Sequence, residues 1–226
     1  MALRMADING NSFIGVFCSL IGDRVLCPVD APDEFVNDLE RTLGVKAVRA
    51  SIGATSLHGS LVRGNSRGII IPYFYDEDEV RRTLADAGDM EDVHILSLDD
   101  PHTAWGNNIL SSEKAALVNP DIRKGSLELI GDILGVEVVQ GTIAGVKTVG
   151  SVAAMNSKGM VVHPRIDESE RKILEELFGV DIAVCTANFG SPYLGASIIA
   201  NDEGALVGRK TSGVEMNRIE NTLDLI

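Results

Sequence analysis

The amino-acid sequence predicts an α/β fold, a closed ring of five ββαβ repeats with pseudo-fivefold symmetry. One observation is a glycine that recurs ahead of short apolar segments with a period of about 45 residues. The other is a fifth copy that ends one strand short, while a spare apolar segment precedes the first copy. A fixed period of this length is typical of equal supersecondary units in an array. The recurring glycines are Gly15, Gly59, Gly106, Gly150 and Gly195.

The first part of the unit is predicted to be a β-hairpin. In the fourth copy, the apolar runs Val152–Met155 and Met160–Val162 flank the polar segment Asn156-Ser157-Lys158-Gly159. Two apolar runs joined by a short loop that ends in glycine are typical of a hairpin, with the glycine in the left-handed conformation. The second and fifth copies repeat the segment as Asn65–Gly68 and Asn201–Gly204, so the same hairpin is expected there.

An amphipathic helix is predicted after the hairpin. Acidic residues at Asp167–Glu170 suit a helix N-terminus, where the helix dipole favours negative charge. The residues that come next repeat at helical spacing and predict one apolar face, and the first copy has a similar stripe. These faces consist of Ile173, Leu174, Leu177 and Phe178 in the fourth copy, and of Phe35, Val36, Leu39 and Leu43 in the first.

The ends of the helices are marked as well. Ser212 and Glu215 have the spacing of a capping box at the start of the fifth helix. A glycine follows the helix in three copies, where a left-handed residue commonly ends a helix. These glycines are Gly44, Gly135 and Gly179.

A third strand is predicted after each helix, at Val45–Val48, Val136–Val139 and Val180–Val184 in the copies where it is clearest. The fifth copy stops at Ile226 without this strand, and the segment Ala2–Ala6 can supply it and close the ring. Closure also removes exposed sheet edges.

We expect a single domain over residues 1–226, because a unit of about 45 residues can hardly bury a core alone. Its repeats are expected at about 11–55, 56–103, 104–147, 148–192 and 193–226, closed by the strand at 2–6.

Composition restricts the function further. The chain has 226 residues and a formal net charge of −13, which disfavours binding along a nucleic-acid backbone. We expect no membrane segment and no signal peptide, since no apolar run reaches membrane length. An odd number of cysteines, three, favours reduced thiols and a cytoplasmic location. We further expect a monomer.

Candidate catalytic and metal-binding residues are sparse. Cys18, Cys27 and Cys185 are scattered in apolar strands without a C-x-x-C motif, so we predict small buried residues rather than a zinc site. The four histidines are dispersed and none pairs with another at helical spacing. We therefore expect no metal, no cofactor and no catalytic residue.

The junctions between each third strand and the next unit are polar and small, as in the segment Ser51–Ser56 and the segment Thr186–Ser191. In a ring these junctions meet near one mouth of the axis. They could bind a ligand, line a wet channel that satisfies backbone groups with water, or face a partner, and loops on a rigid scaffold often carry function.

Several of these segments together resemble the translation initiation factor 6 family, the ribosome anti-association factors. The similar segments, whose order and spacing are specific, are Ser51–Gly53, Thr103–Asn107, Thr148–Ser151, Asn156–Gly159, His163–Pro164 and Gly195–Ala205. The similarity runs from about Leu3 to Ile226, and the chain ends as the archaeal form of the family does. The resemblance implies the pentein fold, the same five-unit ring.

The resemblance also implies a function and a set of contact positions. It implies binding to the large ribosomal subunit, through a ribosomal protein at the subunit interface and nearby rRNA, which blocks association with the small subunit. The matching partner-binding positions are Ser60, Asn65, Asn107 and Ser151. At the Ser60 position some relatives carry a basic residue instead.

The alternative is a pentein-fold guanidino-group hydrolase or amidinotransferase. Those enzymes pair a nucleophilic cysteine with a histidine that an acidic residue follows two positions later. The four histidines are followed at that distance by Ser60, Leu96, Ala104 and Arg165, so the pattern favours a protein that is not an enzyme. A passive scaffold ring stays open as a third interpretation.

Overall fold

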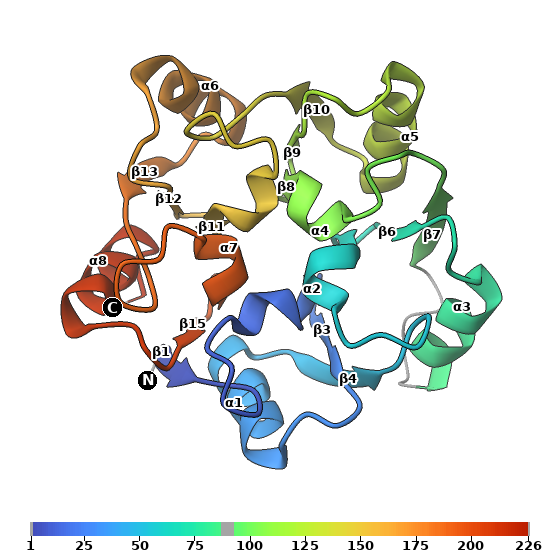
Figure 1. Cartoon of the computed structure of the whole chain (residues 1–226), viewed down its shortest axis with the longest axis horizontal. Coiled ribbons are helices and arrows are strands. Elements are labelled where there is room, and N and C mark those ends of the chain that lie inside the picture. Colours follow the sequence, from blue (N-terminus) through green and yellow to red (C-terminus); the bar gives the residue numbers. More distant parts are fainter. Residues whose placement is uncertain (1, 87–92, 226) are drawn as a thin grey trace.

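The computed structural model describes residues 2–86 and 93–225, and in them five three-stranded sheets surround a central axis (Figure 1). In each sheet the second strand of the unit lies in the middle. It pairs antiparallel with the first strand and parallel with the third, as β3 does with β2 and β4. Long helices occupy the five corners and short helical turns surround the axis (Figure 1). The α/β ring of five repeats is therefore confirmed.

The strands follow the predicted order within every unit. The first strands are β2 (Ser19–Ile21), β5 (Arg63–Gly64), β8 (Ile109–Ser111), β11 (Ala153–Met155) and β14 (Ile198–Ala200). The second strands are β3 (Arg24–Pro28), β6 (Gly68–Pro72), β9 (Ala115–Val118), β12 (Gly159–Val162) and β15 (Ala205–Gly208). The third strands are β4 (Lys46–Ala50), β7 (His94–Leu98), β10 (Glu137–Gln140), β13 (Asp181–Val184) and β1 (Leu3–Ala6).

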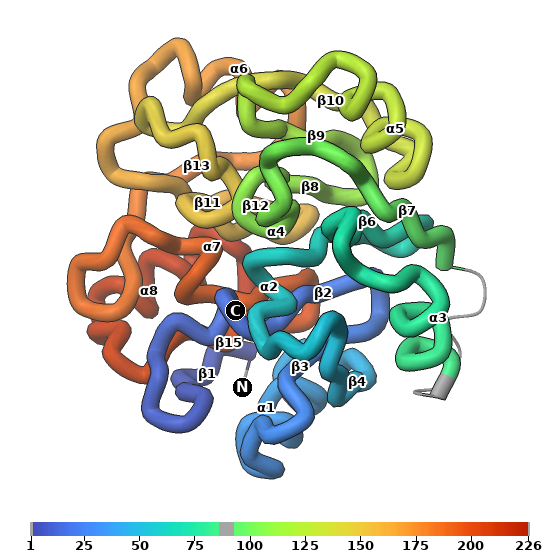
Figure 2. The backbone as a smooth tube through the Cα atoms, turned by 45° about the vertical axis from the view of Figure 1, so that its right-hand side comes forward, coloured from blue at the N-terminus to red at the C-terminus, as the bar shows by residue number. Residues whose placement is uncertain are grey.

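The fifth sheet takes its third strand from the start of the chain. β1 pairs parallel with β15, with Leu3 opposite Ala205 and Ala6 opposite Gly208. Both chain ends consequently lie beside this sheet, as Figure 2 shows in the turned view. The core is shared between neighbouring units in the same way, because Leu206 of the fifth unit packs in one cluster with Leu39 of the first.

The outer helices are α1 (Asp33–Leu43), α3 (Glu77–Asp86), α5 (Lys124–Leu134), α6 (Glu168–Phe178) and α8 (Gly213–Thr222). The capping box of Ser212 and Glu215 is present, and Asp167 and Glu170 form a second one at α6. Gly44, Gly135 and Gly179 end their helices in the left-handed conformation, as predicted.

The apolar face of α6 is narrower than its pattern indicates. Leu174 and Phe178 are buried and Leu177 is partly buried, whereas Ile173 is 44% exposed. Ile173 therefore lies at the edge of the apolar stripe, where its side chain is in contact with solvent.

The recurring glycines lie inside short turns around the axis, directly ahead of the first strand of each unit. These inner turns are η1 (Ile14–Val16), α2 (His58–Leu61), α4 (Trp105–Asn108), η2 (Val149–Ser151) and α7 (Leu194–Ser197). A Cβ atom on Gly59 would overlap the Gly15 carbonyl oxygen, and each of the five glycines meets the preceding one in this way around the ring. Glycine is required here by backbone packing between units.

The hairpin glycines also differ from the prediction. Gly68, Gly159 and Gly204 do not have positive φ angles, so the left-handed assignment is wrong. A Cβ atom on Gly159 would instead overlap the carbonyl oxygen of Thr222, at the end of α8 in the next unit. The glycine is needed because a neighbouring helix end approaches the hairpin closely.

No helix within residues 2–86 and 93–225 combines the length and the hydropathy needed to cross a bilayer.

Candidate partner-binding face

The path of the chain gives the ring two different faces. Because the second and third strands run parallel, both end on the same face, together with the loops that lead into the next unit. We call this the junction face; it carries the loops at about 7–13, 51–57, 99–104, 141–148 and 185–193, the inner turns and the outer-helix N-termini. The opposite hairpin-turn face carries the turns at 22–23, 65–67, 112–114, 156–158 and 201–203.

Buried or partly buried carboxylates fasten the junction loops to the outer helices. Glu215, which is 9% exposed, accepts hydrogen bonds from the Thr186 hydroxyl (2.7 Å) and from the Gly190 amide (2.8 Å). It also accepts from the Ser212 amide at 2.7 Å. Burial alone would raise the pKa of Glu215, but these hydrogen bonds outweigh burial and lower it, so the group stays ionised.

Glu170 has the same role one unit earlier. It accepts from the Thr142 hydroxyl at 2.5 Å and from the Ala144 and Gly145 amides at 2.7 and 2.9 Å. Its pKa is also lowered, because these hydrogen bonds together exceed the effect of burial. Both carboxylates therefore pre-form a loop of the junction face before any partner binds.

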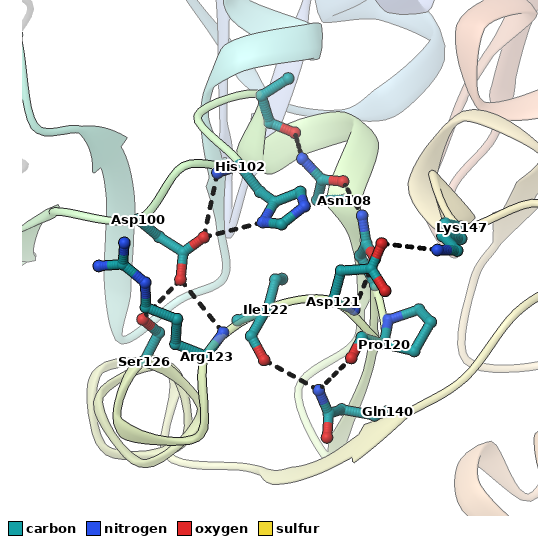
Figure 3. Close-up of polar contacts among 12 residues, drawn as sticks. Asp100, His102, Asn108, Pro120, Asp121, Ile122, Arg123, Ser126, Gln140 and Lys147 are labelled. Atoms are coloured by element: carbon teal, nitrogen blue, oxygen red, sulfur yellow. Dashed lines mark hydrogen bonds and ion pairs between the residues drawn. The ribbon is translucent and has the colours of Figure 1, made fainter.

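The third unit uses the reverse arrangement, with the carboxylate on the loop. Figure 3 shows Asp100 between the His102 ring and the N-terminus of α5. Asp100 is fully buried and accepts from the His102 amide (3.0 Å), the Arg123 amide (3.2 Å) and the Ser126 hydroxyl (2.9 Å). Burial would raise the pKa of Asp100, yet the hydrogen bonds from His102, Arg123 and Ser126 lower it overall.

Asp100 also lies 2.9 Å from Nδ1 of His102, so one histidine does have an acidic partner. The expectation that the acid must follow the histidine missed this pair, because Asp100 precedes His102 by two residues. The cysteines offer no exposed thiol to match this pair, since Cys18, Cys27 and Cys185 are all buried. Burial raises the pKa of the Cys27 and Cys185 thiols to about 11 and that of Cys18 still more clearly, so the thiols stay protonated.

The structure brings three of the four predicted contact residues to the junction face. Ser60, Asn107 and Ser151 each follow the axis glycine of their unit, in three consecutive units, and each is partly exposed. Asn107 lies within α4. Within the described residues, the Ser60 hydroxyl and the Asn107 carboxamide form no side-chain hydrogen bond, which leaves both available to a partner. The Ser151 hydroxyl donates to the Thr148 carbonyl at 2.6 Å.

Asn65 lies on the hairpin-turn face and is only 4% exposed. Its amide donates to the Leu134 carbonyl at 2.8 Å, and its oxygen accepts from the Arg67 and Gly68 amides. These contacts give Asn65 a structural role, on the face opposite the other three positions.

Exposed apolar side chains gather on the junction face, which the sequence patterns did not indicate. Phe13, Leu57 and Tyr193 each stand directly before an inner turn and are 38%, 40% and 50% exposed. Phe189, in a junction loop, is 84% exposed. Further members on this face are Val29, Tyr73, Phe74 and Val214. Such residues are normally scattered, so their concentration on one face favours a docking surface.

Among residues 2–86 and 93–225 there is no cluster of three potential metal ligands. The junction face combines exposed aromatic rings and neutral polar side chains, on loops that the carboxylates of Glu170 and Glu215 hold in place.

Comparison with known proteins finds a family match and full-length relatives. A model of the eIF-6 family matches residues 3–222. A protein of Methanosarcina mazei named translation initiation factor 6 is 39% identical over 225 residues, which cover 99% of both chains. A protein of the same name from Picrophilus torridus is 40% identical, and the match covers 98% of this chain and 99% of the relative. Another from Pyrococcus abyssi is 36% identical, and that match covers 100% of both chains.

Proposed function

The chain belongs to the eIF-6 family, and from this membership we propose that it binds the large ribosomal subunit through its junction face and prevents the small subunit from joining. The observation that carries the proposal is the 39% identity over 99% of both chains to a protein named translation initiation factor 6. The expected role is in translation initiation, and the asymmetry of the two faces supports the choice of surface.

The proposed contact is polar at its centre and apolar on one side. Asn107 and Ser60 sit close to the axis with unused hydrogen-bonding groups, and Phe13, Leu57 and Tyr193 extend the surface over the neighbouring units. Aromatic residues are enriched at protein–protein interfaces, whereas phosphate backbones require clustered basic residues. The surface therefore suits a ribosomal protein as its main partner, with rRNA in the periphery.

The proposed mechanism is occlusion without catalysis. A rigid ring that covers part of the subunit interface excludes the other subunit sterically, and its effect needs only affinity and pre-formed geometry. Loops held by Glu170 and Glu215 lose little conformational freedom on binding, so the cost of ordering is small. We propose a monomer that acts in the cytoplasm and is not an enzyme, a view that the protonated, buried thiols support.

Cosedimentation with purified ribosomal subunits tests the proposal. We expect the protein to migrate with large subunits and not with small ones, and to suppress formation of joined ribosomes when both are mixed. Equal binding to both subunits, or unchanged joining at saturating protein, would contradict the proposed function.

A further inference from the structure

A cavity of about 650 Å³ runs along the axis of the ring. The five axis glycines line it toward the junction face, and the hairpin turns, among them Ser66, Ser112 and Asn156, line it at the opposite mouth. A volume of this size is typical of sites for small molecules. Of the proposed docking residues, Asn107 lines this cavity at its junction-face end, whereas most of the remaining lining lies on the first strands and the hairpin turns. A ligand site among those strands and turns would therefore lie away from the proposed docking contacts.

One wall of this cavity carries an arginine where the other units carry neutral residues. In the second unit, Arg63 of the first strand lies opposite Ile70 of the second strand. The residues that hold the position of Arg63 in the other four units are Ser19, Leu110, Ala154 and Ile199. The fold therefore does not require a cation at this level of the wall.

The guanidinium of Arg63 is fixed but not neutralised. Its Nε donates to the Ser111 hydroxyl oxygen at 2.9 Å and its Nη2 to the Ser111 carbonyl at 3.2 Å. These bonds leave the two Nη1 protons and one Nη2 proton without a protein acceptor among the described residues. The Ser111 hydroxyl, which here accepts, keeps its own proton for a further acceptor.

The carboxylates that line the same cavity are engaged elsewhere. Asp23 pairs with Arg24 at 2.5 Å, and Glu113 accepts from the amide and hydroxyl of Ser66 at 3.0 and 2.5 Å. Asp202 accepts from the amide and the hydroxyl of Ser157, both at 2.8 Å. Within the part of the chain that the structure describes, no carboxylate forms an ion pair with Arg63.

This charge cannot be removed by losing a proton. Burial lowers the pKa of the Arg63 guanidinium to about 10, since no acidic group offsets the desolvation, and arginine remains charged at neutral pH. Arg63 is partly buried and lines the cavity, so its free donors face the interior of the ring, where an anion from solution could take the place of the missing counter-charge. Lys114, on the hairpin turn that follows Ser111, adds a second cation at the same side of the mouth without an ion pair among the described residues.

We propose that the axial cavity is a binding site for a small oxyanion, the phosphate or carboxylate group of a small molecule, held by the free guanidinium protons of Arg63 and the hydroxyl of Ser111. Arginine presents its donors in a fork that matches both groups. The carboxylates of Asp23, Glu113 and Asp202 around the mouth disfavour polyanions, so the ligand is a small molecule and not a nucleic-acid strand. An anion bound there also links the second and third units.

Isothermal titration calorimetry of the purified protein tests this inference. One series titrates inorganic phosphate and the other titrates acetate, both at a constant ionic strength that is set with chloride. We expect saturable binding in at least one series, and the responding series shows which oxyanion is preferred. Arg63→Leu introduces the side chain that the third unit has at this register, at Leu110, and it should weaken the affinity for the anion at least tenfold. Arg63→Lys should bind with intermediate affinity, because it keeps the charge but loses the fork.

Arg67→Leu is the matched control, because Arg67 lies on the adjacent turn but does not line the cavity, and it should bind like the unchanged protein. Phosphate stabilises proteins generally through exclusion from their surface, so a rise in Tm alone does not count as binding. Absence of saturable heat in both series for the unchanged protein overturns the proposal, whatever the variants do. Equal affinity of Arg63→Leu and the unchanged protein overturns it as well.

Discussion

The Asn201 carboxamide donates a 2.7 Å hydrogen bond to the carbonyl of Leu43, 158 residues earlier in the chain. The bond joins the hairpin turn of the fifth unit to the end of α1 in the first. Asn156 makes the same bond to Leu223, and Asn65 makes it to Leu134. The boundary between the last and first units is therefore held like the boundaries inside the ring.

Replacing Asn201 should weaken the closure of the ring. Asn201→Ala removes the donor to a helix-terminal carbonyl and the acceptor for the Glu203 and Gly204 amides, so we expect a loss of about 1–3 kcal/mol in the free energy of unfolding. Denaturant unfolding measures it. Asn37→Ala, at an exposed position of α1, should stay within about 0.5 kcal/mol; equal effects of both variants would refute the role of the bond.

The axis glycines should tolerate no side chain. Gly106→Ala would place a methyl group on the carbonyl oxygen of Gly59, so we expect destabilisation of about 3 kcal/mol or more. Gly125→Ala in α5 is the matched control, because its Cβ atom would point into open space and alanine favours a helix by up to about 1 kcal/mol. Thermal unfolding compares the two, and an unchanged Tm for Gly106→Ala would contradict backbone contact at the axis.

Acid should loosen the junction face. The pKa of Glu215 is lower in the folded protein, so its stabilising effect is present above the unfolded pKa of about 4.5 and is lost as the pH falls through the folded value. Glu215→Gln should cost about 1.5–3 kcal/mol at neutral pH and reduce the change in stability between pH 5 and 3.

Urea unfolding at a series of pH values measures this effect. Glu128→Gln, at an exposed position of α5, is the control and should leave stability at neutral pH within about 0.5 kcal/mol. If Glu215→Gln shows the same pH dependence as the unchanged protein, the carboxylate does not fasten the loop.

Asn107 should matter for binding and not for folding. Asn107→Ala should cost about 1–3 kcal/mol of affinity for large subunits if the residue lies at the centre of the contact, with little change in Tm. Binding assays and thermal unfolding separate the two effects. Lys158→Ala on the hairpin-turn face should bind normally, and a variant of Asn107 that unfolds early but binds with full affinity would show a structural role.

The three cysteines should be inert in the native protein. Their buried, protonated thiols should react with a disulfide reagent at pH 8 far more slowly than in urea, where all three become accessible. The absorbance change on adding the reagent measures this. Rapid reaction of one native thiol, together with turnover of a guanidino substrate, would favour the enzyme alternative.

The ring could be predicted because its signals are local and repeated. A helix cap such as Ser212 with Glu215 lies within four residues, and the strand at Leu3–Ala6 could be assigned because the fifth unit visibly lacked one. The inner turns were missed, since α4 spans only Trp105–Asn108 and is too short to show helical periodicity.

The candidate site was harder to predict, because its contacts join distant residues. An asparagine in a turn looks the same whether it faces solvent or, like Asn65, binds a carbonyl 69 residues away. Exposed residues such as Phe189 and Tyr193 look like core residues in a sequence, since apolar character alone does not give orientation.

The pairing of β1 with β15 has a consequence for synthesis on the ribosome. The strand Leu3–Ala6 can find its partner, Ala205–Gly208, only after about 200 further residues have been made. Until then the nascent fifth sheet cannot form and one edge of the growing array stays open, where the strand could pair with another chain. The fifth sheet can therefore be completed only once residues 205–208 have been made, so a product truncated before them would retain an unsealed edge.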